Sequence, residues 1–244
     1  MKILVNGAGG RMGRVLLGLI ESGLQGAELA GAVDSYSRGD GVLPSLRAFD
    51  SRADCIIDFS NHAATQELTS YAAAHSLPLV IATTGQTEEE LGVIRGASAL
   101  IPIFLSGNMS MGIALLASLA RQTAQAFPDA DIEIVEVHHN QKLDVPSGTA
   151  LMLARSIQDV RPDAEPVVGR HENGRRRKQE IGIHSLRLGN VVGEHMVVVD
   201  TGSQSITLKH EAHDRSLFAE GALSAAAFLI GKRPGLYNMN DLVR

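Results

Sequence analysis

Short apolar runs alternate with helical patterns through the first hundred residues of this chain. The runs are four or five residues long, as in buried strands, and predict strands at residues 2–5, 30–33, 55–59, 79–82 and 101–104. Between the first two, apolar residues at helical spacing predict a helix with one apolar stripe: Met12, Val15, Leu16, Leu19 and Ile20. Residues 63–74 and 88–94 predict two further helices. This alternation favours an α/β fold with a doubly wound parallel sheet and right-handed crossovers.

The pattern changes after Asn108. A run of small and apolar residues over 111–126 predicts a long helix, and residues 131–138 alternate polar and apolar positions as a half-buried strand does. A second helix is predicted from Ser147 to about residue 157. This part of the chain therefore predicts a separate α+β domain.

Three β-rich runs follow, at residues 181–188, 191–199 and 203–210. They are separated by Gly189-Asn190 and Asp200-Thr201-Gly202, which are residues typical of hairpin turns. We therefore expect the second domain to hold a mostly antiparallel sheet built from hairpins.

The last helical pattern, residues 215–230, is rich in alanine and apolar on most faces. This composition is typical of a buried helix, and we expect it to return over the first sheet. The first domain would then be discontinuous, with residues 1–109 and 215–244, and residues 110–214 would form the second domain.

Composition excludes several classes of function. The chain has 244 residues, 44% of them hydrophobic, and a net charge of −5, which gives no general attraction to nucleic acid or to an anionic membrane. Its basic cluster, residues 175–178, is interpreted as a solvated loop. No segment approaches the ~18–20 apolar residues that span a bilayer. A single cysteine, Cys55, excludes an internal disulfide and lies in an apolar strand, where a thiol is inert. We expect a cytoplasmic protein.

A glycine-rich turn directly follows the first predicted strand and opens the first predicted helix. At this position the helix N-terminus offers N–H groups to a dinucleotide diphosphate, and glycines let it approach the backbone. The turn predicts a Rossmann-like cofactor site formed by Gly7, Ala8, Gly9, Gly10, Arg11 and Met12. A glycine turn alone also serves as a plain connector.

Asp34 strengthens the prediction, because it ends the second predicted strand 21 residues after Gly13. A carboxylate there accepts hydrogen bonds from the adenosine ribose. The acid favours NADH, whereas Arg11 and Arg38 leave NADPH open, so the predicted cofactor is NADH or NADPH.

Two further loops follow the fourth and fifth predicted strands, where ligands of such sheets bind. The residues of the first loop are Ala82, Thr83 and Thr84, and those of the second are Ser106, Gly107, Asn108 and Met109. We interpret both loops as contacts for the nicotinamide, although each also fits a simple turn.

The segment from His138 to Thr149 places proton donors and an anion site together. His138 and His139 end a strand and point to opposite sides of it, so one of them is the candidate proton donor for a given substrate. Lys142 offers a second donor or a cation. Ser147 is a good N-cap, and the N–H groups after it can bind a carboxylate. We reject a metal site, because the nearby acids lie along the strand and do not close a ligand set.

These motifs resemble the 4-hydroxy-tetrahydrodipicolinate reductase (dihydrodipicolinate reductase) family over essentially the whole chain. The specific matches are residues 7–13, Ile57-Asp58-Phe59-Ser60, residues 82–85, residues 108–112, residues 136–150 and Val192-Gly193-Glu194-His195.

The resemblance implies a nicotinamide-dependent oxidoreductase of diaminopimelate and lysine biosynthesis, which reduces 4-hydroxy-tetrahydrodipicolinate, a small dicarboxylate, to tetrahydrodipicolinate. It makes His138 the catalytic acid and Lys142 the second proton donor. It assigns the substrate carboxylates to His139, Ser147, Gly148 and Thr149. It also implies a homotetramer assembled through the β-rich domain.

Two alternatives stay open from the residues. One is a related imine or amino-acid dehydrogenase, such as aspartate dehydrogenase, which has no need of the Pro-Ser-Gly-Thr anion site after the histidines. The other is a non-catalytic NAD(P)-binding regulator, which has no need of His138 or Lys142.

Overall fold

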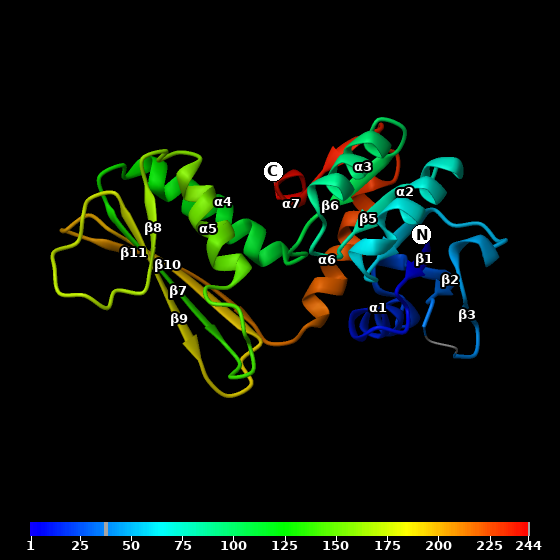
Figure 1. Ribbon diagram of the computed structural model, residues 1–244, viewed down its shortest axis with the longest axis horizontal. Helices are drawn as coiled ribbons and strands as arrows, with labels where there is room; N and C mark the ends of the chain where they lie inside the picture. Colours follow the sequence, from blue (N-terminus) through cyan, green and yellow to red (C-terminus); the bar gives the residue numbers. More distant parts are fainter. Residues whose placement is uncertain (37–38, 244) are drawn as a thin grey trace. The chain divides into compact units, whose positions relative to one another are not determined.

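A computed structural model describes residues 1–36 and 39–243 (Figure 1). Arg38, which the sequence analysis considered for NADPH binding, lies outside the described residues. The chain divides into two compact units. The first holds residues 1–110 and 216–242, and the second holds residues 111–215. No helix of the described part is long and apolar enough to cross a membrane.

The first unit is built on a parallel sheet, which in its described part has the order β12-β6-β5-β4-β1-β2-β3. This order confirms the Rossmann-like fold. The strands are β1 (Lys2–Asn6), β2 (Glu28–Val33), β3 (Val42–Leu43), β4 (Cys55–Asp58), β5 (Leu79–Ile81), β6 (Pro102–Leu105) and β12 (Gly235–Tyr237). The sequence did not predict β3 and β12, which at two and three residues are too short to show a period.

Helices cover both faces of this sheet (Figure 1). The α-helices are α1 (Arg11–Glu21), α2 (Thr65–Ala74), α3 (Glu88–Ser98), α6 (Ser216–Leu229) and α7 (Met239–Leu242), with short 3₁₀ turns at Leu24–Gly26, Leu46–Ala48 and His62–Ala64. Helix α1 packs against α6, and α2 packs against α3. Helix α6 returns from the far end of the chain to contact β4, β5 and β6.

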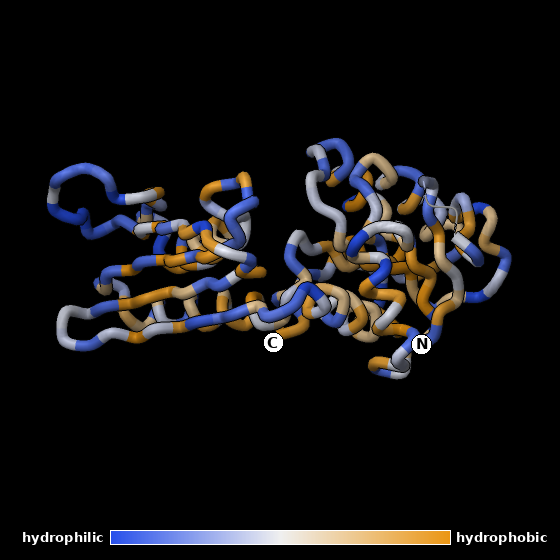
Figure 2. Tube along the Cα trace, turned by 90° about the horizontal axis from the view of Figure 1, so that it is seen from below, coloured by the Kyte–Doolittle hydropathy of each residue, from blue (hydrophilic) through white to orange (hydrophobic). Residues whose placement is uncertain are grey.

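The second unit packs two helices, α4 (Met111–Ala126) and α5 (Gly148–Gln158), on a mixed sheet. Its strands, in the order β11-β10-β7-β9-β8, are β7 (Asp131–His138), β8 (Glu165–Val168), β9 (Glu180–Arg187), β10 (Gly193–Asp200) and β11 (Ser205–Ala212). Alternate residues of β7 and β10 are buried in its core, among them Ile132, Ile134, Val197 and Val199. Figure 2 shows hydrophobic segments in the interior of each unit and hydrophilic ones mainly in its outer loops.

One predicted hairpin is wrong. The turn after Asp200 does join β10 and β11 as an antiparallel pair. The turn at Gly189 and Asn190, however, joins β9 and β10, and β7 lies between these two strands. Strand β7 is parallel to β9 and antiparallel to β10. Turn residues specify a change of direction, whereas the pairing partner is decided by burial: the apolar face of β7 is completely buried at the centre of the sheet.

The basic cluster at residues 175–178 is exposed as the sequence suggested, except for Arg176. Arg176 is only 17% exposed and donates hydrogen bonds to Asp131 and Glu133 of β7. Arg177 pairs with Glu165 and Glu180, and Lys178 with Asp129. These cations therefore hold the loop after β8 on its own sheet.

Candidate functional site

The glycine turn between β1 and α1 is so tight that two of its positions accept only glycine. Gly7 has a φ of 81°, and a Cβ there would lie 2.6 Å from the carbonyl group of Phe59. A Cβ at Gly13 would lie 2.8 Å from the Ala8 Cα and closer still to the carbonyl oxygen of Gly7. Real side chains avoid such contacts, so both glycines are needed for α1 to begin against the turn.

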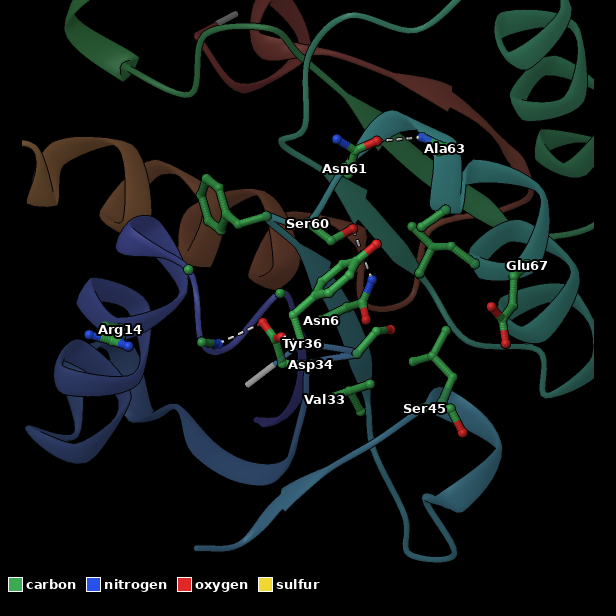
Figure 3. A pocket seen from close by; sticks show the side chains of 18 residues that line it. Asn6, Arg14, Val33, Asp34, Tyr36, Ser45, Ser60, Asn61, Ala63 and Glu67 are labelled. Carbon is green, nitrogen blue, oxygen red and sulfur yellow. Dashed lines mark hydrogen bonds between the residues drawn. The ribbon is translucent and has the colours of Figure 1, made fainter. Parts of the chain in front are cut away.

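A cavity of about 710 Å³ opens beside this turn, at the carboxyl ends of β1, β2 and β4 (Figure 3). Four of the predicted cofactor residues line it, namely Gly7, Gly9, Gly10 and Asp34. Its other lining residues are Asn6, Arg14, Val33, Ser35, Tyr36, Ser45, Leu46, Phe59, Ser60, Asn61, Ala63, Ala64, Glu67 and Leu68. The volume and the cradle of backbone that a Cβ would fill both fit part of a dinucleotide.

The remaining predicted cofactor residues do not line this cavity: Ala8, Arg11, Met12, Ala82, Thr83, Thr84, Ser106, Gly107, Asn108 and Met109. Ala8 is buried at 1% exposure, and Met109 at 2%. A Cβ at Gly221 of α6 would lie 2.9 Å from the carbonyl carbon of Met109, so this glycine lets α6 pack directly on that loop.

Asp34 ties the turn to the end of β2. Its Oδ2 accepts a hydrogen bond from the N–H of Gly9 at 2.9 Å, and its Oδ1 accepts one from the N–H of Tyr36 at 2.9 Å. Figure 3 shows the carboxylate pointing toward the glycine turn. The acid is thus fixed at the position where the sequence analysis expected a ribose ligand.

Asp58 links three strand ends in a buried network that the sequence did not predict. Its carboxylate accepts hydrogen bonds from Asn6 Nδ2 at 2.8 Å, from the hydroxyl and N–H of Ser60, and from Thr83 Oγ1 at 2.6 Å. Burial raises the pKa of Asp58 against the lowering effect of these bonds. An acid that ends an apolar strand was the available signal, and two of its partners, Asn6 and Thr83, lie at the ends of other strands far away in the chain.

The second unit surrounds His138 with groups that act on its proton. His138 ends β7 and is 8% exposed, and its Nδ1 bonds Oε2 of Glu136, two residues earlier on the same face. Arg187 of β9, the register partner of His138, donates to both oxygens of Glu136 at 3.0 and 2.8 Å. Burial alone would raise the pKa of Glu136, but the bonds from Arg187 and His138 outweigh it and lower the pKa to about 2. Burial lowers the pKa of His138, and Glu136 partly opposes this.

Helix α5 begins beside these groups. Ser147 is its N-cap and is buried at 1% exposure, and its Oγ accepts the N–H of Ala150 at 3.2 Å. The same oxygen lies 3.2 Å from Nε2 of His195 on β10. Burial lowers the pKa of His195 to about 3, so Nε2 of its neutral ring can accept a hydrogen bond from the Ser147 hydroxyl. In the sequence, His195 stands out only within the motif at residues 192–195, and nothing local predicts this contact.

The other predicted substrate residues lie around the same helix start. Gly148 is exposed, and His139 and Thr149 are half-buried. Lys142 forms an ion pair with Asp144 at 2.8 Å, with 21% of its side chain exposed. One unit thus brings together every residue that was predicted to act on the substrate.

Glu136, His138 and His195 also place three ligand-type atoms within 4.8 Å of one another. Both carboxylate oxygens, however, are already bound by the guanidinium of Arg187, a cation that a metal ion would have to displace. The arrangement therefore favours proton handling over metal binding.

Comparison with known proteins matches both units to one family. Residues 1–109 match the model of the dihydrodipicolinate reductase N-terminus, and residues 112–243 match that of the C-terminus. The chain belongs to the dihydrodipicolinate reductase family. The predicted family and its class, an NAD(P)H-dependent oxidoreductase, are thereby confirmed.

Relatives in this family match the chain from end to end. A 4-hydroxy-tetrahydrodipicolinate reductase from Caldanaerobacter subterraneus subsp. tengcongensis is 45% identical, with 100% of this chain and 98% of the relative covered. One from Clostridium tetani is 41% identical, covering 100% and 97%. The solved structure of a dipicolinate-bound dihydrodipicolinate reductase from Paenisporosarcina sp. TG-14 matches with a TM-score of 0.85 and 24% identity over 99% of each chain, which shows the shared fold.

Proposed function

We propose that this member of the family reduces 4-hydroxy-tetrahydrodipicolinate to tetrahydrodipicolinate, in diaminopimelate and lysine biosynthesis. The proposal rests on the surroundings of His138. This buried histidine bonds the carboxylate of Glu136 through Nδ1 and lies next to the N-terminus of α5. Such a pair is suited to donate a proton to a substrate whose own carboxylates bind at the helix N-terminus.

Each predicted residue then has a defined task. When bound, the nicotinamide supplies a hydride to an electrophilic ring carbon. Nε2 of His138 gives the proton that completes the reduction, because Nδ1 is engaged by Glu136. Lys142 is the second proton donor. His139, Thr149 and the backbone N–H groups that follow Ser147 hold the carboxylates.

In this proposal the cavity of the first unit would hold the dinucleotide. Gly7, Gly9 and Gly10 would face the diphosphate, and Asp34 would accept hydrogen bonds from the ribose hydroxyls. The loops at residues 82–84 and 106–109 would contact the nicotinamide. We propose NADH as the preferred cofactor, because the carboxylate of Asp34 repels the 2′-phosphate of NADPH.

Cofactor choice is tested with Asp34→Asn. The ratio of kcat/KM for NADH over NADPH is expected to fall by about tenfold, the effect of losing a hydrogen bond to a charged group. Asp50→Asn, on an exposed loop of the same unit, should leave the ratio unchanged. An unchanged ratio in Asp34→Asn contradicts the assignment.

The second unit also provides a surface for assembly. One face of its sheet carries α4 and α5, and the other face presents half-buried apolar side chains such as Val135, Met196 and Val198. We propose that this face joins subunits into a homotetramer. Analytical ultracentrifugation of wild type and Val198→Asp tests this, with dissociation expected for the variant and a wild-type monomer refuting it. A reduced, buried Cys55 accords with a cytoplasmic enzyme.

The main proposal is tested by turnover. Loss of nicotinamide absorbance is followed with freshly generated hydroxy-tetrahydrodipicolinate for wild type, His138→Ala and Lys142→Ala. The variants should lose about 10²- to 10⁴-fold in kcat. His75→Ala, an exposed histidine of the first unit, is the matched control. No turnover by wild type overturns the function, and full activity of both variants overturns the mechanism alone.

A further inference from the structure

Glu136 is a buried carboxylate that the proposed chemistry does not consume. It is 0% exposed, yet it is kept ionised by the donors around it. Its Oε2 bonds His138 and Arg187, and its Oε1 bonds Arg187 and the N–H of Ser147 at 3.2 Å. Because donors from β9 and from the start of α5 hold both oxygens, the carboxylate has little freedom to rotate.

Arg187 extends this hold to the loop that carries Lys142. Besides Glu136, its Nη2 donates to the carbonyl oxygen of Asp144 at 2.8 Å. Asp144 in turn pairs with Lys142. One guanidinium therefore connects the carboxylate partner of His138 with the loop that carries Lys142. The strands that bring these groups together, β7 and β9, lie side by side in Figure 1.

The other edge of the His138 ring lies against a residue without a side chain. A Cβ at Gly193 of β10 would lie 3.1 Å from Nε2 of His138. The ring of His195 meets that of His138 edge to face, with centroids 5.1 Å apart. The surroundings of His138 thus differ at its two nitrogens, with an anion at Nδ1 and a glycine at Nε2.

We propose that Glu136, held by Arg187, is a positioning residue that keeps the Nδ1 proton of His138 in place and reserves Nε2 for the substrate. The inference rests on the proposed role of His138 as acid. In the protonation step, the Nε2–H bond of His138 breaks and its proton goes to the substrate. Nδ1 keeps its proton and its hydrogen bond to Glu136, so the imidazolium becomes a neutral imidazole. Solvent restores the proton.

The charges that face the ring make this carboxylate necessary. Lys142 of the loop and Arg187 of β9 are cations that oppose a proton on His138, and burial opposes it too. His195 of β10 is neutral near physiological pH. Among the described groups that act on His138, Glu136 is the one anion. Its loss should lower the pKa of His138 and free the ring to adopt the other tautomer.

The tautomer is measured first, in the wild-type enzyme, by nitrogen NMR of isotope-labelled histidine. The His138 signal is assigned by its absence in His138→Ala. We expect neutral His138 to carry its proton on Nδ1. A proton on Nε2 overturns the inference without reference to any activity, and so separates it from failure of the proposed function, which would show as absent turnover.

Kinetics of Glu136→Gln supply the second test. We expect kcat at neutral pH to fall about 10²-fold, the alkaline limb of the pH profile to move to lower pH, and KM to change much less. Glu180→Gln is the matched control, because Glu180 is another buried glutamate of this sheet with two arginine partners, and it lies away from His138. Its kcat and pH profile should stay at wild-type values.

Arg187→Lys is the variant to use if Glu136→Gln fails to fold. It keeps the positive charge but loses the bidentate hydrogen bonds to the carboxylate of Glu136. It should lower kcat and shift the same limb in the same direction. An unmoved pH limb in a folded variant, or an equal kcat loss in Glu180→Gln, would show a purely structural role and overturn the inference.

Discussion

Gly13→Ala tests whether the glycine turn is built for close approach or merely connects a strand to a helix. Gly13 lies in the first turn of α1. The added Cβ would lie 2.8 Å from Cα of Ala8 and closer to the carbonyl oxygen of Gly7. All these neighbours are backbone atoms of the turn, so no side chain can rotate away to make room.

The size of the effect follows from the contact. Carbon atoms pack at about 3.5–4.0 Å, so the helix start or the turn has to move by roughly 1 Å. Overpacking of this kind costs about 1–3 kcal/mol of stability, offset by about 1 kcal/mol because alanine favours a helix. A shift of this size at a site that positions a cofactor can cost about 10²-fold in rate. We therefore expect NADH to bind at least about tenfold more weakly.

Gly18→Ala in the same helix is the control, because a Cβ there meets nothing within 4 Å. It should raise the free energy of unfolding by about 0.5–1 kcal/mol and leave NADH affinity unchanged. Urea denaturation and calorimetric titration with NADH measure both quantities. If Gly13→Ala binds NADH as wild type does and is as stable as Gly18→Ala, the close-approach reasoning is refuted.

Three further outcomes are expected. Asp58→Asn puts an amide donor where Thr83 and other donors converge. Its free energy of unfolding, measured by urea denaturation, should therefore fall by about 1–3 kcal/mol, and it should bind NADH more weakly. Wild-type stability and affinity would contradict the role of the network. Ser147→Ala removes the N-cap of α5, so its free energy of unfolding should fall by about 1 kcal/mol. An unchanged free energy of unfolding would show that the cap is dispensable. His195 has its pKa lowered from 6.5 to about 3, so the unfolded chain binds its proton first and stability falls as the pH drops between these values. His195→Gln should lose less stability than the wild type as the pH drops through this range. An equal loss in both proteins would show that His195 does not cause the pH dependence.

Much of the first unit could be predicted because its signals are local. Parallel strands buried on both faces appear as continuous apolar runs, and the crossover helices carry one apolar stripe. The turn at residues 7–13 is also local, because a diphosphate site needs glycines at a strand-to-helix junction. Family motifs around His138 and Ser147 are similarly contained within a dozen residues.

The second sheet was harder to predict because its pairing is not local. Gly189 and Asn190 indicate a turn, but they do not say that β7, some fifty residues earlier in the chain, separates the strands on either side. The same limit hid Arg187 and His195. Each looks like an ordinary strand residue until β9 and β10 align beside β7.

The sequence by itself determined most of the strands and helices of the first unit, though not β3, β12 or α7. It also determined the glycine turn, the acid Asp34 and the cluster from His138 to Thr149. Each of these follows from residue spacing within a single element or loop. Only the tertiary structure decided which groups govern the proton of His138. Glu136, Arg187 and His195 meet there because three strands pair in a register set by burial of their apolar faces, and no local pattern encodes that register.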